Sequence, residues 1–583
     1  MYSQNPQAQN FYQIRATCAQ YGTLFEDNEF PPVNRSLYVS GADRHLSRVG
    51  PVTWKRPFEL SNQPKFYADG VSRHDVIQGE LGNCWFIAAV SNLTLHQNLF
   101  VQVVPQDNTF ERGQYCGAFH FRFWTFGRWV EIVIDDRLPC NSRGQLLFMQ
   151  SQDKSEFWSC LLEKAYAKFH GSYESLSGGI ASEAMQDFSG GIIEMIDIQE
   201  TQWNNVNNQS ELFSVMSKAQ DRASLMTCAL HNQAGRIGET RTGQGLVAGH
   251  AYSITGVCEV SVYNGAQIAQ LVRIRNPWGD FEWNGAWSDS SREWSSVDAG
   301  TKARLGLVKR NDGEFWMNVD DFQDHFHRLE ICHLSPDPVN DVKLSNPAQQ
   351  NFIPWKRMAF EGAWIPGQSA GGCMNHNTFA TNPQYFFDFT ASSVDGSADK
   401  CTVVVSLIQQ TASRSYTRKE GLGKSCIGFR MFRIPRYTGL MDMSFFKRER
   451  SLSSGSYINS REISARFEVA TGTYVIVPST FEPNMGGNFL LRIFSEPPAP
   501  QMAPQQAYPH PQQQQWGAPP QVQYAHAPPQ APYAPPPYAA AQYPPAQQNM
   551  MGGYPPSYGV PPAQPLPPTG PPPGAGPGFG WNL

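Results

Sequence analysis

The sequence predicts an α+β globular region followed by an all-β sandwich and a disordered tail. Three observations support this organisation. The chain has 583 residues, whereas one hydrophobic core stops growing at roughly 250 to 300 residues. Residues 23–336 are rich in Trp and Phe, whereas the sequence after residue 345 contains short apolar runs. No Asp, Glu, Lys or Arg follows Glu496. We therefore expect several domains, each with its own composition.

The region from 345 to 497 predicts a sandwich because its apolar runs are short and separated by Gly, Ser and Asn. The expected strands include Thr402–Ile408, Ile427–Ile434, Tyr474–Pro478 and Phe489–Phe494. Residues 498–583 are rich in Pro, Gln, Ala and Tyr, which predicts a disordered tail with polyproline II character. The tail is either a docking segment for protein partners or a passive solubilising extension.

Composition and charge narrow the function classes. The formal net charge of −5 gives no general electrostatic reason to bind nucleic acid or an anionic membrane, so we expect protein partners. The eleven cysteines show no paired spacing and no Cys-x-x-Cys, which excludes a disulfide framework or zinc-ligand pattern and indicates a reducing compartment. No segment approaches the roughly 18 apolar residues of a membrane span, and the first residues lack a targeting pattern. We expect a soluble, cytoplasmic protein.

Cys84 is the first candidate for chemistry. Asn83 is a suitable N-cap, and Phe86, Val90 and Leu93 follow at helical spacing. Cys84 would then begin a buried helix, whose unsatisfied N–H groups and dipole favour the reactive thiolate. Gln78 lies on the preceding glycine-bearing turn, so its amide and the Cys84 N–H are candidate oxyanion donors. An isolated cysteine is usually a small core residue, but the flanking Gln and glycines favour a nucleophile.

A nucleophilic cysteine needs a base and a group that orients the base. His250 begins one apolar run and Asn276 ends another, and Asn264-Gly265 between them predicts a two-residue hairpin turn. An unbroken ladder would place Asn276 opposite Ser253, on the wrong face. A single bulge would place it opposite Tyr252, on the face of His250, so we predict a bulge in this hairpin.

Trp278 follows Asn276 by two residues and is predicted to shield the histidine and asparagine from water. Taken without the cysteine motif, His250 would be an ordinary hydrogen-bonded core histidine and Trp278 a core aromatic residue.

The sequence motifs around Cys84, His250 and Asn276, together with further segments between and after them, resemble the calpain family of cysteine proteases. The resemblance covers residues 23 to 497. The matching text is Gln78-Gly-Glu-Leu-Gly-Asn-Cys84-Trp85, Glu156-Phe157-Trp158, Leu161-Leu-Glu-Lys-Ala-Tyr166, Gly171-Ser-Tyr, Gly249-His250-Ala-Tyr-Ser, Arg275-Asn276-Pro277-Trp278-Gly279, Asp312-Gly313-Glu314-Phe315-Trp316, Gly371-Gly372, Thr381-Asn382-Pro383-Gln384 and Val477-Pro478-Ser479-Thr480-Phe481-Glu482-Pro483.

The resemblance implies a papain-like protease core in two subdomains, 23–190 with Cys84 and 191–336 with His250 and Asn276. An N-terminal segment, 1–22, precedes this core, and a calpain-type β-sandwich, 345–497, follows it. The implied activity is that of a calcium-dependent cysteine endopeptidase, a hydrolase that cuts protein substrates in a limited way. Cleavage would pass through a thioester on Cys84, with His250 as base and Asn276 as orienting group.

The resemblance also implies one calcium ion in each subdomain. Oxygen ligands suit calcium, and their irregular spacing differs from that of an EF-hand loop. The matching positions in the first subdomain are the carbonyls of Ala68 and Gly70 and the carboxylates of Asp75 and Glu156. Those in the second are Glu282, Asp289, Asp312 and Glu314, with a carbonyl near Arg310. Taken singly, each of these acids would usually be a solvated loop residue.

Arg73 and Glu314 match the pair that couples the two calcium sites in the family. Cys84 and His250 are predicted to lie on separate bodies, so calcium binding would favour the aligned arrangement in which they form a catalytic pair.

Two features depart from the conventional family pattern. No segment fits an EF-hand loop, so the chain is atypical and we expect no EF-hand small-subunit dimer. The sandwich stretch Ala391–Lys400, where conventional members carry a dense acidic loop, has only Asp395 and Asp399 as acids. Binding of membrane phospholipid is weakly supported, because the basic residues Lys447, Arg448 and Arg450 are equally a solvated face.

Two other functions share features with this sequence. Transglutaminase-like acyl transfer also uses a Cys-Trp pair at a helix start, but its third member is an Asp, whereas this chain has Asn276. The second alternative is a non-catalytic scaffold that binds partners through the sandwich and the tail. Such a scaffold would be a pseudoenzyme, and pseudoenzymes usually lose the nucleophile or the base. Cys84, His250 and Asn276 are all present, which favours the peptidase.

Overall fold

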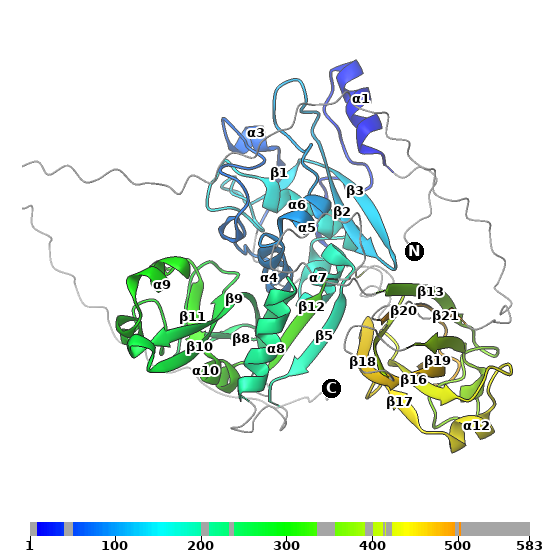
Figure 1. Cartoon of the computed structure of the whole chain (residues 1–583). Coiled ribbons are helices and arrows are strands. Elements are labelled where there is room, and N and C mark those ends of the chain that lie inside the picture. Colours follow the sequence, from blue (N-terminus) through cyan, green and yellow to red (C-terminus); the bar gives the residue numbers. More distant parts are fainter. Residues whose placement is uncertain are drawn as a thin grey trace, which may run out of the picture. The chain divides into compact units, whose positions relative to one another are not determined.

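The protein is described here by a computed structural model. The structure describes residues 9–39, 50–199, 209–232, 238–334, 356–390, 400–411, 414, 423–495 and 501–502. Helices, strands and loops are mixed through residue 334, and the rest of the described chain is mainly β-structure (Figure 1). This is the expected α+β region followed by an all-β sandwich.

The first half of the α+β region is built on helices. Its central helix α4 (Cys84–Leu93) is buried along almost its whole length, and Phe86 stacks on Tyr166 of α6 with ring centroids 4.5 Å apart. The other elements of this half are α1 (Phe11–Tyr21), α2 (Asn34–Leu37), β1 (Thr53–Lys55), α3 (Pro57–Leu60), the 3-10 helix η2 (Arg73–Asp75), α5 (Gln97–Val103), β2 (Ala118–Thr125), β3 (Arg128–Asp135), β4 (Leu138–Cys140), α6 (Trp158–His170), η3 (Glu174–Leu176) and α7 (Ala181–Ser189).

The second half is built on an antiparallel six-stranded sheet with the order β11-β10-β9-β6-β12-β5. Helix α4 packs against β9 and β6 of this sheet (Figure 1). The elements are β5 (Ile192–Asp197), α8 (Gln209–Asp221), β6 (Leu225–Leu230), β7 (Thr240–Arg241), β8 (Val247–Ala248), β9 (His250–Val262), η4 (Tyr263–Gly265), β10 (Gln267–Arg275), η5 (Arg292–Ser296), α9 (Ala299–Arg304), β11 (Glu314–Asn318), α10 (Val319–His325) and β12 (Arg328–His333).

The β9–β10 hairpin contains the predicted bulge. Arg273 pairs with Gly256, whereas Ile274 pairs with Ile254, so Thr255 is the extra residue. The predicted two-residue turn is wrong. Val262 pairs with Gln267, which leaves a four-residue loop that begins with η4, and Tyr263 takes a positive φ of 51°. The added loop residues are accommodated by this short helical turn, and the strand register that matters for Asn276 is the one predicted.

The sandwich consists of two antiparallel sheets, ordered β13-β20-β15-β18 and β17-β16-β19-β14-β21. Each of the four predicted strands is confirmed, and β16 has the predicted bounds. Side chains from both sheets form the core between them. The elements are β13 (Lys356–Trp364), η7 (Phe379–Thr381), β14 (Tyr385–Phe389), β15 (Lys400–Gln409), β16 (Ile427–Ile434), α12 (Met443–Arg448), β17 (Ser451–Ser453), β18 (Glu462–Ala470), β19 (Gly472–Thr480), β20 (Gly487–Ser495) and β21 (Gln501–Met502).

Some predictions fall on residues outside the described ranges. They include the acid-poor stretch at 391–399 and the tail beyond residue 502. Gln501 and Met502, which were predicted to belong to the disordered tail, instead form β21 beside β14. An exposed edge of β14 offers backbone partners to any extended segment that follows the sandwich closely.

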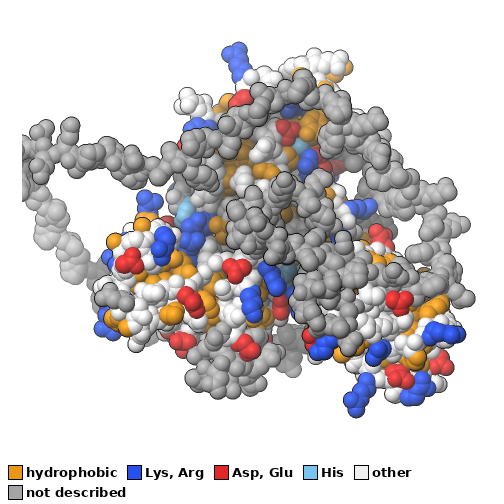
Figure 2. Space-filling model, viewed as in Figure 1, with side chains coloured by type: hydrophobic (Ala, Val, Ile, Leu, Met, Phe, Trp, Pro, Cys, Tyr) orange, Lys and Arg blue, Asp and Glu red, His pale blue; other side chains and the backbone are white. Residues whose placement is uncertain are grey.

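Charged side chains are distributed without a dominant sign. Among the described residues on the face shown in Figure 2, acidic and basic side chains are interspersed and neither sign forms a continuous patch. None of the described helices is long and apolar enough to cross a lipid bilayer.

Candidate active site

Cys84 is the first residue of α4, as predicted. Asn83 occupies the N-cap position, but its side chain does not cap the helix. Its Nδ2 instead donates to Oε1 of Glu163 at 2.7 Å, and Oε2 of Glu163 accepts from the Met149 N–H at 2.9 Å. Burial raises the pKa of Glu163 to about 7. This buried anchor fixes the loop before Cys84 and so places the thiol at the start of α4.

His250 and Asn276 meet across the bulged hairpin. Nε2 of His250 lies 2.8 Å from Oδ1 of Asn276, as expected if Asn276 is opposite Tyr252. The amide orientation is determined by its other bonds, because Nδ2 of Asn276 donates to the carbonyls of Asp280 and Phe281, each at 3.0 Å. Oδ1 is therefore the acceptor, and the imidazole must carry its proton on Nε2.

With Nε2 bonded to Asn276, the other ring nitrogen of His250, Nδ1, faces the Cys84 thiol. Sγ of Cys84, a ring nitrogen of His250 and a carboxylate oxygen of Glu239 all lie within 4.8 Å of one another. Burial opposes a charge on His250, but Cys84 and Glu239 outweigh it and raise the imidazole pKa to about 10. A nucleophilic cysteine needs a base within reach of its sulfur, and His250 occupies this position.

Trp278 lies against the imidazole, as expected for a shielding residue. The ring centroids of His250 and Trp278 are 5.1 Å apart, and the guanidinium of Arg241 lies 5.3 Å from the Trp278 ring centroid. The backbone N–H of Trp278 also donates to Oδ1 of Asn276 at 3.1 Å. Trp278 thus packs beside the imidazole and helps to hold the amide of Asn276, and its shielding role stays a prediction.

Gln78 lies on the turn before α4. Its Nε2 donates to the Leu81 carbonyl at 2.8 Å, and its backbone N–H donates to the Pro277 carbonyl at 3.0 Å. The amide has a second N–H, so its assignment as an oxyanion donor stays a prediction. A side chain at Gly79 would meet the Leu147 and Phe148 carbonyls at 2.4 and 2.5 Å, and glycine is therefore required at this position.

The four predicted calcium positions of the first half lie in one region. Oε1 of Glu156 accepts from the Ala68 N–H at 2.8 Å, and Asp75 ends η2. Burial raises the pKa of Asp75, and burial together with the Asp75 charge raises that of Glu156. Gly70 has a left-handed φ of 98°. Two neighbouring carboxylates that repel each other are a suitable environment for a cation.

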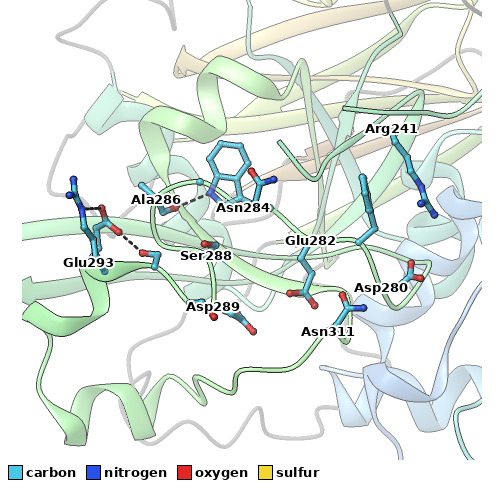
Figure 3. A pocket seen from close by; sticks show the side chains of 15 residues that line it. Arg241, Asp280, Glu282, Asn284, Ala286, Ser288, Asp289, Glu293 and Asn311 are labelled. Carbon is cyan, nitrogen blue, oxygen red and sulfur yellow. Dashed lines mark hydrogen bonds and ion pairs between the residues drawn. The ribbon is translucent and has the colours of Figure 1, made fainter. Parts of the chain in front are cut away.

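Two residues of the second predicted set, Glu282 and Asp289, line a pocket of about 750 Å³, and their carboxylates project into it (Figure 3). Arg310, Asp312 and Glu314 are not among the residues that line this pocket. Oε1 of Glu282 accepts from the N–H groups of Asp312 and Gly313, each at 2.8 Å. Oδ2 of Asp289 accepts from the Arg310 N–H at 3.1 Å.

The charges of this pocket also fit a cation. Burial and the Asp289 charge raise the pKa of Glu282 to about 7, and burial with the charges of Asp312 and Glu314 raises that of Asp289 to about 6. The candidate ligands, Glu282, Asp289 and Asp312, offer oxygen atoms from separate segments of the chain. Oxygen ligands suit calcium, and this spacing differs from that of an EF-hand loop.

Glu314 forms an ion pair with Arg73 through both of its carboxylate oxygens. The guanidinium donates to Oε1 at 2.6 Å and to Oε2 at 2.7 Å, and Oε1 also accepts from the hydroxyl of Thr255 at 2.8 Å. Burial opposes ionisation, but Arg73 and Arg273 hold the pKa of Glu314 at about 2. The predicted coupling pair is thus formed, and it joins η2 of the first half to β11 of the second. Since both oxygens contact Arg73, a calcium-ligand role for this side chain would compete with the ion pair.

Two site residues were missed in the sequence. Glu239 bonds Nδ1 of His250 at 2.7 Å, and its side chain is 27% exposed. Nothing in its local sequence distinguishes it from a solvated loop acid. Arg275 is fully buried and donates to the Asp312 carbonyl at 2.6 Å and to the Val76 carbonyl at 3.3 Å. A charged residue directly before Asn276, at the end of an apolar run, was the available signal for this second link between the halves.

Comparison with known proteins gives two family matches. Residues 25–333 match the calpain family cysteine protease, and residues 360–494 match domain III of the calpain large subunit. Calpain-B of Drosophila melanogaster is 45% identical over 496 residues, covering 84% of this chain and 51% of that protein. Calpain-9 of Mus musculus is 44% identical over 490 residues, covering 84% and 67%.

The chain thus spans from about half to two thirds of the length of these relatives. The matched region contains the cysteine helix, the bulged hairpin and both sheets of the sandwich. This chain belongs to the calpain family of cysteine proteases.

Proposed function

We propose that the protein is a calcium-dependent cysteine endopeptidase that performs limited proteolysis of protein substrates. The observation that carries this proposal is the arrangement of Cys84, His250 and Asn276, in which one ring nitrogen of the imidazole is held by the amide and the other faces the thiol. Asn276 as third member favours peptide hydrolysis over the transglutaminase-like alternative.

The chemistry follows from this arrangement. The thiolate of Cys84 attacks the scissile carbonyl carbon, and the charge that develops on the carbonyl oxygen is stabilised by the Cys84 N–H and the Gln78 amide. The His250 imidazolium then protonates the leaving amine as the C–N bond breaks, which leaves a thioester. His250 next takes a proton from water, the hydroxide adds to the thioester carbon, and the acid product leaves as the thiolate forms again.

Calcium enters the proposal through the two acidic regions. Asp75 and Glu156, with the carbonyls of Ala68 and Gly70, would hold one ion. The other would be held by Glu282, Asp289 and Asp312, of which Glu282 and Asp289 line the pocket of Figure 3. Bound calcium would supply the positive charge that offsets repulsion among these carboxylates. Arg73 then ties the halves together through Glu314.

We propose a cytoplasmic location as well. The described residues include all eleven cysteines, each as a thiol outside any disulfide bond, which is typical of proteins in a reducing compartment. Protein substrates are the expected partners. Nucleic acid binding, phospholipid binding and an EF-hand partner subunit are not part of the proposal.

The test is hydrolysis of casein by the full chain with and without millimolar calcium. We expect cleavage that requires calcium and disappears in Cys84→Ser. Cys426→Ser is the matched control because Cys426 is an exposed cysteine of the sandwich, and this variant should cleave at the rate of the original chain. Cleavage without calcium would retain the peptidase and remove the metal sites, and cleavage by Cys84→Ser would remove the mechanism.

A further inference from the structure

Three different metal-binding side chains converge at the catalytic cysteine. Within the described ranges, the group formed by Cys84, Glu239 and His250 is the one set of at least three His, Cys, Asp or Glu donors whose ligand atoms all lie within 4.8 Å of one another. The donors come from separate segments: the start of α4, the start of β9, and the residue before β7. The site is therefore a product of the tertiary fold rather than of a local motif.

The histidine is already oriented for a metal. Asn276 holds the proton on Nε2, so a neutral His250 would offer the Nδ1 lone pair, and Nδ1 lies 2.7 Å from Oε1 of Glu239. A hydrogen bond from the second ring nitrogen of a ligating histidine is the usual device that fixes its tautomer and orientation. Asn276 would serve this purpose while it also serves the protease.

We propose that Cys84, His250 and Glu239 form an inhibitory binding site for a zinc ion. Thiolate, imidazole and carboxylate are the ligands that zinc takes, whereas calcium takes oxygen ligands alone. Three protein ligands leave the fourth tetrahedral position for water. The thiolate of Cys84 and the carboxylate of Glu239 together balance the two positive charges of the ion.

The His250 and Glu239 ligand atoms need to separate only slightly to accept the metal, and Sγ of Cys84 lies within 4.8 Å of both. Zinc bonds of about 2.0 to 2.3 Å in a tetrahedral site separate the ligand atoms by about 3.4 Å. The contact between Nδ1 of His250 and Oε1 of Glu239 must therefore open by about 0.7 Å. Zinc replaces the proton shared by these two atoms, the proton passes to solvent, and no group is oxidised or reduced.

The expected consequence is reversible loss of nucleophilicity at Cys84, because zinc occupies the sulfur electron pair that attacks the substrate. Inhibition of cleavage rests on the function proposed above, but zinc binding does not, since it can be measured without a substrate. The calcium sites are filled with excess calcium in every experiment, so that oxygen-only sites do not contribute.

The first experiment titrates the full chain with zinc by calorimetry and with cobalt(II) by absorption, in calcium and a thiol-free reductant. We expect one equivalent of zinc and a thiolate-to-cobalt charge-transfer band. Cys84→Ser should abolish the band, and Glu239→Gln should weaken zinc binding by at least about tenfold. Glu211→Gln, an exposed acid of α8, is the matched control and should bind zinc as the original chain does.

The second experiment follows alkylation of each cysteine by iodoacetamide and mass spectrometry. Zinc should slow labelling of Cys84 and leave labelling of the exposed Cys426 unchanged, and Glu239→Gln should require about tenfold more zinc for the same protection. A charge-transfer band that survives in Cys84→Ser, equal zinc affinity in Glu239→Gln, or equal protection of Cys426 would each overturn the proposal. Zinc binding without any casein cleavage would uphold the metal site and reject the proposed protease.

Discussion

The two ring nitrogens of His250 have different hydrogen-bond partners. Nε2 bonds Asn276 and thereby determines the tautomer, while Nδ1 faces Glu239 and the region of the Cys84 thiol. The hydrogen bond to the amide is buried, so it is protected from competition with water. The carboxylate is partly exposed and is the more replaceable neighbour.

Replacing Asn276 with Ala should therefore damage catalysis and spare substrate binding. We expect kcat to fall roughly 100-fold with little change in KM, because the imidazole loses its orientation and its preferred tautomer. Steady-state cleavage of a peptide substrate measures both constants. Gln270→Ala on the same strand β10 is the control and should change neither, and a rise in KM alone would contradict the orienting role.

The bulge in the β9–β10 hairpin serves two purposes. It places Asn276 on the face of His250, and its extra residue Thr255 donates its hydroxyl to Glu314. Glu314 in turn bonds Arg73 of η2. The hairpin that carries His250 is thus connected through hydrogen bonds to η2, the element that ends in the predicted calcium ligand Asp75.

Removing Arg73 should uncouple these elements. In Arg73→Gln the Glu314 carboxylate loses both hydrogen bonds from Arg73 and keeps the guanidinium of Arg273 at 3.7 Å, and an incompletely paired buried charge costs about 1 to 3 kcal/mol. We expect the calcium concentration for half-maximal casein cleavage to rise about tenfold.

A calcium titration of the cleavage rate checks this expectation. Arg112→Gln, an exposed arginine of the first half, should leave the calcium requirement unchanged. An unaltered requirement in Arg73→Gln would show that the pair does not couple the halves.

The α+β region and the sandwich contact each other through buried charges. Glu183 of α7 bonds Arg414 at 2.9 Å and also pairs with Lys424. The guanidinium of Arg492 lies buried between Glu462, at 2.7 Å, and the Gly191 carbonyl, at 3.0 Å. Removing one partner of a buried ion pair strongly destabilises a protein. The stability of each region therefore depends on its contacts with the other.

Glu183 should make stability depend on pH. Burial alone would raise its pKa, but Arg461, Lys424 and Arg414 hold it at about 2, below the usual value near 4.3. The unfolded chain then binds more protons than the folded one between these values. The stabilisation, about 3 kcal/mol, is present above pH 5 and is lost as pH falls toward 2.

Thermal unfolding followed between pH 7 and pH 3 measures this contribution. Glu183→Gln should lower the unfolding midpoint at pH 7 and should show a smaller further decrease on acidification than the original chain. Glu259→Gln, an exposed acid of β9, should leave the pH profile unchanged. Parallel profiles for Glu183→Gln and the original chain would contradict the assignment.

Much of the site could be read from the sequence because it depends on local periodicity. Helical spacing after Cys84 placed the thiol at a helix start. The need for His250 and Asn276 to share a face required a bulge, which the strand register confirms. The turn was misjudged because Asn264-Gly265 is equally compatible with a longer loop that starts in η4.

The sequence by itself determined the order of the domains, the helix that carries the cysteine and the hairpin that carries its base, since each depends on residues close together in the chain. Only the tertiary structure decided that Glu239 joins Cys84 and His250, that Arg275 is buried between the halves, and that Glu183 meets the sandwich. Contacts of this kind join loop and surface residues whose neighbours come from distant segments. No local pattern encodes them, because they arise only when separately folded elements pack together.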